Sequence, residues 1–171
     1  MKNISFLFSF LFVLSCSNDS PDDLNNDDNN GGTPVTDYEV WTGANITFTK
    51  APNTDAGDAA NQDRITSNVA ITRGTSGGEI FNAVSESDAT ENVSPRGTKW
   101  AVGNISDVES LSFSSFRSAV GKPKNVVGKN LVMYLEDDKV YLTVKFLSWA
   151  SGGGGSNGGS GGFSYERSTK D

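Results

Sequence analysis

The sequence predicts one all-β domain, a single β-sandwich or jelly-roll-like fold, that follows a signal peptide and a disordered tether. Apolar and polar residues alternate in several short segments with the period of a β-strand. Glycine, asparagine, aspartate and proline separate these segments, as they do in turns. No window carries a sustained helical repeat of apolar residues bounded by helix caps. Short strands divided in this way are typical of β-sandwiches and jelly rolls.

Residues 1–15 have the composition of a signal peptide. Lys2 precedes an apolar run from Ile4 to Leu14 that only two serines interrupt. This run is too short for a helix that crosses a bilayer. A basic start followed by a short apolar core is typical of a secretory signal. We therefore expect the chain to be exported.

The residues Val13-Leu14-Ser15-Cys16 resemble a bacterial lipobox, in which an apolar and a small residue precede a cysteine. The resemblance implies cleavage before Cys16 and lipidation of its thiol, and Leu14 departs from the small residue usual at its position. The alternative is an ordinary signal peptide followed by an unpaired cysteine. Cys16 is the only cysteine, so the chain forms no internal disulfide.

Residues 16–37 are predicted to form a disordered acidic tether. Leu24 and Val35 are the only sizeable apolar residues after Cys16 in this segment. So little apolar surface cannot offset the conformational entropy lost on folding. Acidic residues shortly after a lipidated cysteine resemble the surface-export signals of Bacteroidetes-type lipoproteins. The resemblance implies display at the cell surface, with the lipid anchor as the only attachment to the outer membrane.

The tether also explains most of the net charge of −7. It holds six of the 21 acidic residues and no basic residue. Since Lys2 lies in the signal peptide, 15 acidic and 13 of the 14 basic residues follow Asp37. The negative charge argues against electrostatic binding to nucleic acid or to an anionic membrane surface. It says little about a ligand of the domain itself.

Residues 38–171 form the predicted domain, which is long enough to bury a core without disulfides. The first strands lie on both sides of a turn at residues 42–45, and Ile46 and Phe48 alternate there with threonines. Residues 64–73 repeat this strand pattern. Residues 110–116 are also predicted as a strand, although the alternation slips at Phe116.

The clearest element is a hairpin near the end of the domain. Residues 131–135 are one apolar run, residues 136–139 are turn-like, and apolar residues alternate from Val140 to Phe146 in a strand that ends at Trp149. Residues 151–162 contain only glycine, serine and asparagine. Phe163 and Tyr165 then alternate with polar residues as in a half-buried strand.

The glycine-rich segment 151–162 allows two interpretations. If the terminal strand pairs with the strand before it, the segment is a long hairpin loop, and closing such a loop costs an entropy that grows only slowly with its length. The alternative is a dispensable flexible tail. Two aromatic residues at strand spacing favour the hairpin, because tails are normally polar.

Several of these segments together resemble an uncharacterised family of exported bacterial β-rich domains. Its elements are a TFTK strand, a QDRIT…ITRG segment, an SP…WAxG segment and a closing KFxSW…GGGFSYxRST motif, which here cover most of residues 40–169. The resemblance implies export and a β-rich fold, and it implies no substrate. This chain departs from the family pattern by a longer glycine tract, which marks that site as a tolerant surface loop.

The absence of histidine excludes several chemistries. Ser-His-Asp and Cys-His catalysis and histidine-ligated metals are not available. With Cys16 lipidated, no thiol nucleophile remains. A pair of carboxylates could still hydrolyse a glycoside, and Asp63, Glu79 and Glu86 are candidates. The alternative is that these carboxylates are solvated or ion-paired.

Residues 53–63 contain the only candidate metal site. Asn53, Asp55, Asp58 and Asp63 lie in one glycine-containing segment, and calcium prefers such oxygen ligands. The spacing does not follow that of an EF-hand and no glutamate closes the segment. An acidic surface turn is the alternative. No other cofactor is expected.

The tryptophans Trp41, Trp100 and Trp149 suggest a ligand face. Exposed aromatic rings of β-sandwich binding modules stack on sugars, while polar groups orient the ligand. The alternative is that the tryptophans form the core, since tryptophan is highly buried on average. The candidate ligand-binding residues are Trp100, Trp149, Tyr165, Arg73, Arg96 and Asn82, with Gln62 as a further polar group. The alternative for Arg73, as for Arg64, is an ion pair with a nearby aspartate.

Three functions follow from these patterns. The leading hypothesis is a cell-surface lipoprotein with a non-catalytic module that binds a glycan or another extracellular polymer. The second is a structural or adhesive lipoprotein that contacts proteins of the envelope. The third is a small carboxylate-dependent glycoside hydrolase. The scarcity of catalytic groups favours binding.

Overall fold

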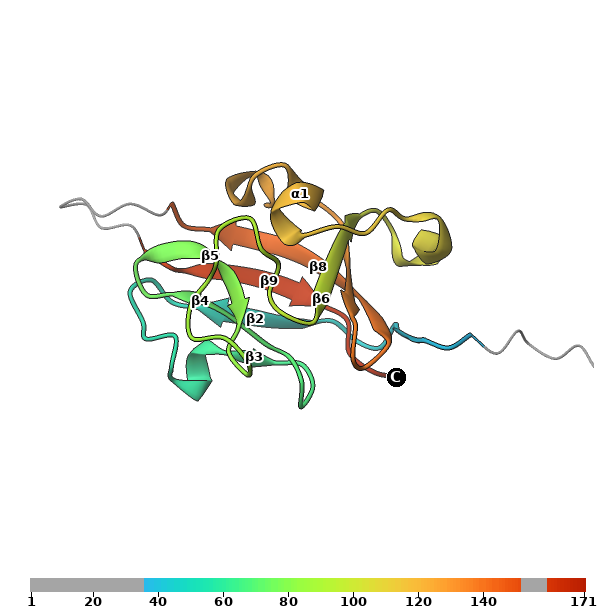
Figure 1. Cartoon of the computed structure of the whole chain (residues 1–171), viewed down its shortest axis with the longest axis horizontal. Helices are drawn as coiled ribbons and strands as arrows, with labels where there is room; N and C mark the ends of the chain where they lie inside the picture. The colour runs from blue at the N-terminus through green and yellow to red at the C-terminus, as the bar shows by residue number, and fades with distance from the viewer. Residues whose placement is uncertain (1–35, 152–159) are drawn as a thin grey trace, which may run out of the picture. The chain divides into compact units, whose positions relative to one another are not determined.

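The computed structural model of the chain describes residues 36–151 and 160–171 (Figure 1). The predicted signal peptide, Cys16, almost all of the tether and the middle of the glycine tract lie outside the described residues. No helix in the described part of the chain is long and apolar enough to span a membrane.

Two β-sheets make up the domain, which confirms the predicted all-β fold (Figure 1). The larger sheet has the order β2-β9-β8-β7-β6, and β1 pairs in parallel with the first part of β8. The smaller sheet has the order β3-β4-β5, and every pair other than β1–β8 is antiparallel. The strands are β1 (Glu39–Trp41), β2 (Ile46–Lys50), β3 (Asp63–Arg64), β4 (Ala70–Gly74), β5 (Gly77–Asn82), β6 (Thr98–Val102), β7 (Leu131–Leu135), β8 (Val140–Trp149) and β9 (Phe163–Arg167).

The predicted strand over residues 110–116 is wrong. Only Ser114 pairs, in an isolated bridge with Trp100, and the chain then enters the helix α1 (Phe116–Val120). The hydroxyl of Ser115 accepts a hydrogen bond from the amide of Ser118, so it caps the helix. Serine competes with strand pairing in this way because its side chain satisfies the free amides at a helix start. The short 3₁₀ turns are η1 (Ala59–Asn61), η2 (Ile105–Ser110) and η3 (Pro123–Asn125).

The strand pattern of residues 64–73 is split between two strands. β3 ends at Arg64 and β4 begins at Ala70. Between them the hydroxyl of Thr66 accepts hydrogen bonds from the amides of Asn68 and Val69, both at 3.1 Å, which turns the chain back on itself. The result is an antiparallel pair in which Asp63 lies opposite Ile71.

Both predicted C-terminal pairings are confirmed. β7 and β8 form the predicted hairpin, with Lys139 at a positive φ of 54° in its turn. β9 pairs with the second half of β8, and Trp149 lies opposite Phe163. The amide of Ala150 donates to the carbonyl of Gly162 at 3.0 Å, so the glycine tract connects two paired strands.

The end of the glycine tract is closely packed. The amide of Gly161 donates to the carbonyl of Thr75 at 3.0 Å. A Cβ atom on Gly161 would overlap the carbonyl of Gly74, and one on Gly162 would crowd Pro52. Only glycine fits this approach of the hairpin to the β4–β5 turn.

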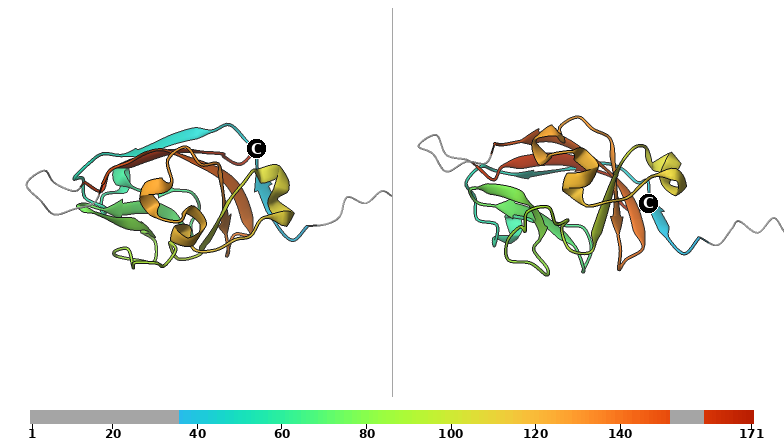
Figure 2. Two further views of the ribbon diagram at one scale, coloured as in Figure 1. Left: turned by 90° about the horizontal axis from the view of Figure 1, so that it is seen from above. Right: turned by 45° about the horizontal axis from the view of Figure 1, so that its top comes forward.

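The core lies on the inner face of the larger sheet, which the smaller sheet and α1 cover (Figure 2). Side chains from both sheets and from α1 are buried together there. The largest hydrophobic ones are Trp100, Phe116, Phe146, Phe163, Tyr165, Ile71, Ile80, Leu131, Met133 and Leu135. The rings of Trp100 and Phe116 meet edge to face with their centroids 5.0 Å apart, which joins the helix to the sheet.

One buried ion pair connects the two sheets. Asp63 on β3 accepts from the guanidinium of Arg167 on β9 at 2.7 and 3.0 Å, and from the hydroxyl of Tyr165 at 2.7 Å. Both charged side chains are more than nine-tenths buried. The carboxylate therefore has both oxygens satisfied inside the protein, as a buried charge requires.

We expect Asp63→Asn to lower the free energy of unfolding by roughly 3 kcal/mol, because it leaves the buried charge of Arg167 without a counter-ion. Urea denaturation measures this loss. Asp58→Asn is the matched control, since Asp58 is exposed and makes no side-chain hydrogen bond among the described residues. Its effect should stay within about 0.5 kcal/mol. Equal stability of Asp63→Asn and the native chain would contradict the role of this pair.

Candidate functional site: a cationic cleft beside Trp149

Two of the predicted ligand-binding aromatics are in the core, so their prediction is wrong. Trp100 and Tyr165 are completely buried. The indole nitrogen of Trp100 donates to the hydroxyl of Thr98 at 2.9 Å, and Tyr165 is bound to Asp63. Burial raises the pKa of Tyr165 further above its usual value, and the Asp63 carboxylate adds to this. Neither ring offers a face to a sugar. Trp41 packs partly buried against the core.

Asn82 and Arg96 lie together, away from the other candidates. Asn82 is buried, and its amide donates to the carbonyls of Asn68 and Arg96 and accepts from the amide of Ala70. It therefore holds the loop after β5 in place. Arg96 is exposed and lies with Asn82 on a separate hollow of about 460 Å³. Gln62 likewise bonds local carbonyls, those of Ala56 and Gly57.

The structure does not assemble the predicted calcium site. Asp63 faces the core and is bound to Arg167, while Asp55 and Asp58 are exposed. Asp55 accepts from the amide of Gly57 at 2.8 Å, as in an acidic surface turn. Within residues 36–151 and 160–171, no three acidic side chains are grouped so that they could hold a metal ion.

The three candidate carboxylates are also apart. Asp63 is bound to Arg167, and Glu86 accepts from the backbone amides of Asn82 and Arg96. Only Glu79 lines the cleft described below.

The structure brings two predicted residues, Trp149 and Arg73, together. The guanidinium carbon of Arg73 lies 3.9 Å from the centre of the Trp149 ring, a cation–π contact. Both residues line a cleft of about 400 Å³ between the β4–β5 hairpin and the segment after α1. This volume falls within the range of small ligand sites.

A β-bulge directs Trp149 to this cleft. The pairing of β8 with β9 shifts between Phe146 and Ser148, so that Trp149 lies opposite the buried Phe163. In a regular strand Phe146 and Trp149 would point to opposite faces, since side chains alternate. The bulge supplies one extra residue and returns Trp149 to the inner side of the sheet.

Arg73 is held by the backbone. Its Nε donates to the carbonyl of Gly78 at 2.9 Å, and its Nη1 donates to the carbonyls of Ala150 and Gly162 at 2.9 and 3.1 Å. Burial lowers the pKa of Arg73 to about 10, which still leaves it charged at neutral pH. No carboxylate in the described part of the chain forms an ion pair with it.

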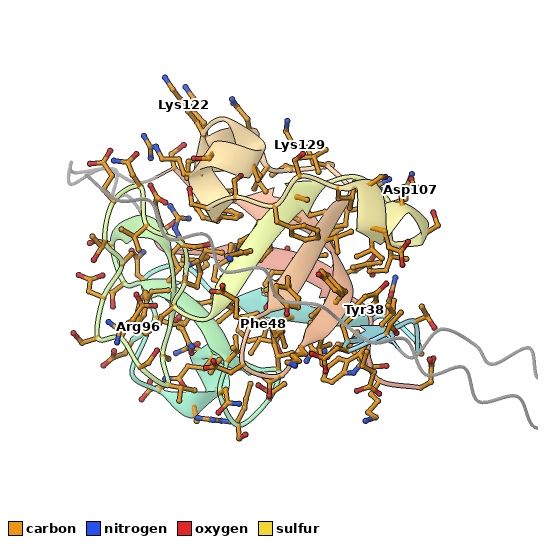
Figure 3. All side chains as sticks on the ribbon, turned by 45° about the vertical axis from the view of Figure 1, so that its right-hand side comes forward. Tyr38, Phe48, Arg96, Asp107, Lys122 and Lys129 are labelled. Atoms are coloured by element: carbon orange, nitrogen blue, oxygen red, sulfur yellow. The ribbon has the colours of Figure 1, made fainter. Side chains whose placement is uncertain are left out.

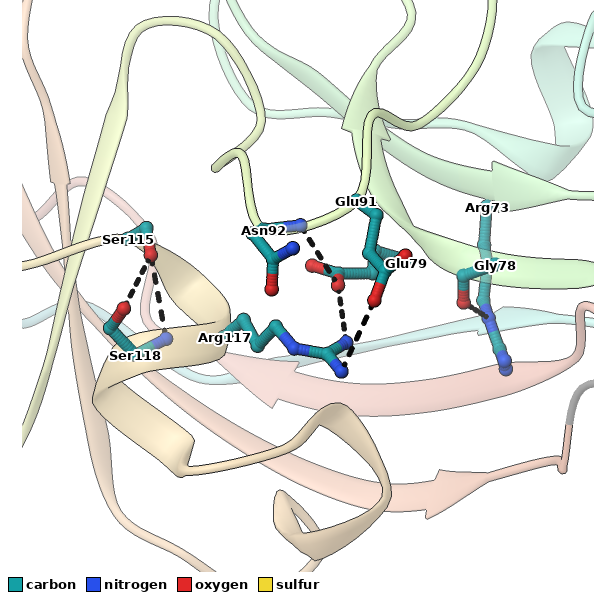
Figure 4. A network of polar contacts seen from close by, with 8 residues as sticks. All are labelled: Arg73, Gly78, Glu79, Glu91, Asn92, Ser115, Arg117 and Ser118. Carbon is teal, nitrogen blue, oxygen red and sulfur yellow. Dashed lines mark hydrogen bonds and ion pairs between the residues drawn. The ribbon is translucent and has the colours of Figure 1, made fainter.

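A second arginine occupies the cleft wall (Figure 4). Arg117 of α1 reaches between Glu79 and Glu91, with N–O distances of 2.7 and 3.5 Å. The amide of Asn92 donates to the same oxygen of Glu79 at 3.3 Å. The other oxygen of Glu79 is buried and has no hydrogen-bond partner among the described residues.

Two lysines line the cleft on the side of η3. Lys122 and Lys124 flank Pro123, whose ring is buried and begins the 3₁₀ turn. Both lysines are exposed, and Lys122 extends away from the ribbon in Figure 3. Neither forms an ion pair with a carboxylate of the described residues.

Sequence reasoning missed Arg117, Lys122, Lys124 and Glu91. A signal was present, because residues 110–135 contain four basic residues and no acidic one. In a chain with a net charge of −7 this segment is unusual and indicates a local positive surface. Trp149 and Arg73 were identified from residue type alone.

The chain matches no protein-family model, no curated protein and no solved structure.

We expect calcium to leave the melting temperature unchanged, because Asp63 has both carboxylate oxygens occupied by Arg167 and Tyr165. Differential scanning calorimetry in millimolar calcium and in chelator measures this. A higher melting temperature in calcium that Asp55→Asn abolishes would contradict this assignment.

Proposed function

We propose that this protein is an exported lipoprotein, attached through Cys16 and displayed at the cell surface, whose β-domain binds a glycan or another extracellular polymer without catalysis. The observation that carries the proposal is the preformed cleft in which the ring of Trp149 adjoins fixed polar side chains. An aromatic surface with a few placed hydrogen-bonding groups is the usual composition of a sugar site.

Preorganisation supports binding at this cleft. Three carbonyls hold Arg73, and Arg117 is held by two carboxylates. Side chains fixed before the ligand arrives lose little conformational entropy on binding, so more of the contact energy contributes to affinity.

The outer face of the larger sheet carries the other aromatic cluster, which suits a ligand less well. Tyr134 and Tyr141 stack on each other with centroids 4.4 Å apart. Tyr38 packs edge-on against Tyr141 at 5.0 Å, and Phe113 lies against both tyrosines of the stack. Trp149 also packs against other aromatic rings, but it lines the cleft, whereas none of the outer-face rings does.

Glu79 and Glu91 share the cleft, as the hydrolase hypothesis requires, but Arg117 lies between them. Glycoside hydrolysis needs one carboxyl group that holds a proton and a second that is ionised. The two carboxyl groups must also flank the scissile bond, and Arg117 fills the space between Glu79 and Glu91. This arrangement supports binding over hydrolysis.

A glycan array tests the proposal with the chain from Cys16 onward, carrying Cys16→Ser so that no lipid is attached. We expect a hit whose affinity falls roughly tenfold or more in Trp149→Ala, since a central aromatic contact often contributes more than 1.4 kcal/mol. Trp149→Phe should keep most of the affinity because it keeps an aromatic ring.

Tyr134→Ala is the control, because it removes an aromatic ring from the outer face of the same sheet. Far-UV circular dichroism verifies that each variant is folded. A blank array with folded protein would overturn the glycan proposal and favour contact with an envelope protein. A hit lost in Tyr134→Ala and retained in Trp149→Ala would move the site to the outer face.

A further inference from the structure

We infer that the ligand of the cleft is an anionic polysaccharide, one that carries carboxylate or sulfate groups along its chain. This inference rests on the proposed function, since it names the class of polymer that the same cleft would bind. It depends on where the positive charges of the domain lie and on which of them lack a partner.

The cleft has the opposite charge to the rest of the protein. Four cations and two carboxylates line it, an excess of two positive charges. The whole chain has a net charge of −7, and residues 38–171 contain 15 acidic and 13 basic side chains. A positive cleft on a negatively charged protein attracts anionic ligands to the cleft, while the rest of the surface repels them. The charged lining residues are Arg73, Arg117, Lys122, Lys124, Glu79 and Glu91.

The two carboxylates of the cleft are already paired. Glu79 and Glu91 both bond Arg117, and the side chain of Glu79 is only 7% exposed. The single positive charge of Arg117 offsets one of the two negative charges. The other positive charges of the cleft belong to Arg73, Lys122 and Lys124. None of these three forms an ion pair with a carboxylate in residues 36–151 and 160–171.

Arg73 is the unusual cation among them. A buried guanidinium normally pairs with a carboxylate, as Arg167 does with Asp63 in the same domain. Arg73 instead has carbonyl dipoles and the ring of Trp149 around it. Lys50 nearby is also buried, bonded to Thr54, and without an ion pair among the described residues. An anionic group in the cleft would supply the counter-charge that this region lacks.

Lys122 and Lys124 extend the positive surface to solvent. They flank the buried Pro123, which fixes the backbone of η3 and so keeps both lysines beside the cleft. An exposed lysine can reach a carboxylate or a sulfate without losing a partner of its own. The cleft thus combines one buried cation with two exposed ones, which suits a polymer with repeated charges.

A neutral glycan would gain little from this arrangement. Its hydroxyls would replace water around the lysines without neutralising any charge. A polyanion would gain both charge-assisted hydrogen bonds and a faster, salt-sensitive association. The inference therefore predicts a difference between polymers that share a backbone and differ in charge.

The test is affinity electrophoresis and calorimetry of the chain carrying Cys16→Ser with three probes: a polyuronate, a sulfated polysaccharide and a neutral polysaccharide of similar linkage. We expect at least one acidic polymer to bind and the neutral one to bind at least tenfold more weakly. Raising the salt from about 50 mM to about 500 mM should weaken the acidic complex, because the Debye length falls well below 10 Å. The two acidic probes separate carboxylate from sulfate as the recognised group.

The double variant Lys122→Ala/Lys124→Ala should weaken binding of the acidic polymer by roughly fivefold to tenfold. Arg64→Ala/Lys145→Ala is the matched control, since it also removes two exposed positive charges, and neither lines the cleft. We expect the control to bind as the native chain does. An equal loss in both double variants would show a nonspecific charge effect and overturn the inference.

The remaining outcomes separate the two proposals. Equal binding of neutral and acidic polymers would overturn the anionic class and leave the glycan site standing. No binding of any of the three polymers, together with a blank array, would overturn the proposed function itself. Binding of a single-stranded DNA oligonucleotide as tightly as the acidic polymer would show that charge alone is recognised and would overturn the polysaccharide class.

Discussion

The structure depends on one buried cation, the guanidinium of Arg73. It lies where three backbone segments meet, and it donates to carbonyls of the β5 start and of both ends of the glycine-rich connection. The same group lies under Trp149. One side chain thus joins the smaller sheet to the β8–β9 hairpin and fixes the aromatic wall of the cleft. Because Gly161 and Gly162 must approach closely for these bonds to form, side chains are excluded there.

Two buried arginines contact the smaller sheet, and their charges are compensated in different ways. Asp63 neutralises Arg167 completely inside the protein. Arg73 has no carboxylate partner among the described residues, and backbone carbonyls and the ring of Trp149 surround its guanidinium instead. Lys50 adds a second buried positive charge. Burial, and then the charge of Arg73, lower the pKa of Lys50. The Asp63–Arg167 pair holds the two sheets together. The uncompensated charge of Arg73 instead leaves a positive potential beside an accessible cleft.

Much of the fold could be predicted from the period of two in the sequence. The β7–β8 hairpin and the pairing of β9 follow from alternation that matches the core-facing residues. The segments 64–73 and 110–116 could not be predicted correctly, because hydroxyls of Thr66 and Ser115 redirect the backbone. The alternation of apolar and polar residues gives no information about such local hydrogen bonds. The strand β6 around Trp100 was likewise not recognised from its short pattern.

The site was predictable only in part, and the tryptophans show why. Trp100 and Trp149 both follow polar or small residues in the sequence, yet the first is in the middle of its strand and the second at the end of a longer one. A central position places Trp100 under α1, where it is completely covered. Trp149 reaches the inner side of the sheet only through the bulge after Phe146. It lies at the end of β8, where a cleft adjoins the sheet. A bulge is set by the pairing of two distant segments. The sequence therefore indicated Trp149 as a candidate by its residue type, whereas its contact with Arg73 could be found only from the folded structure.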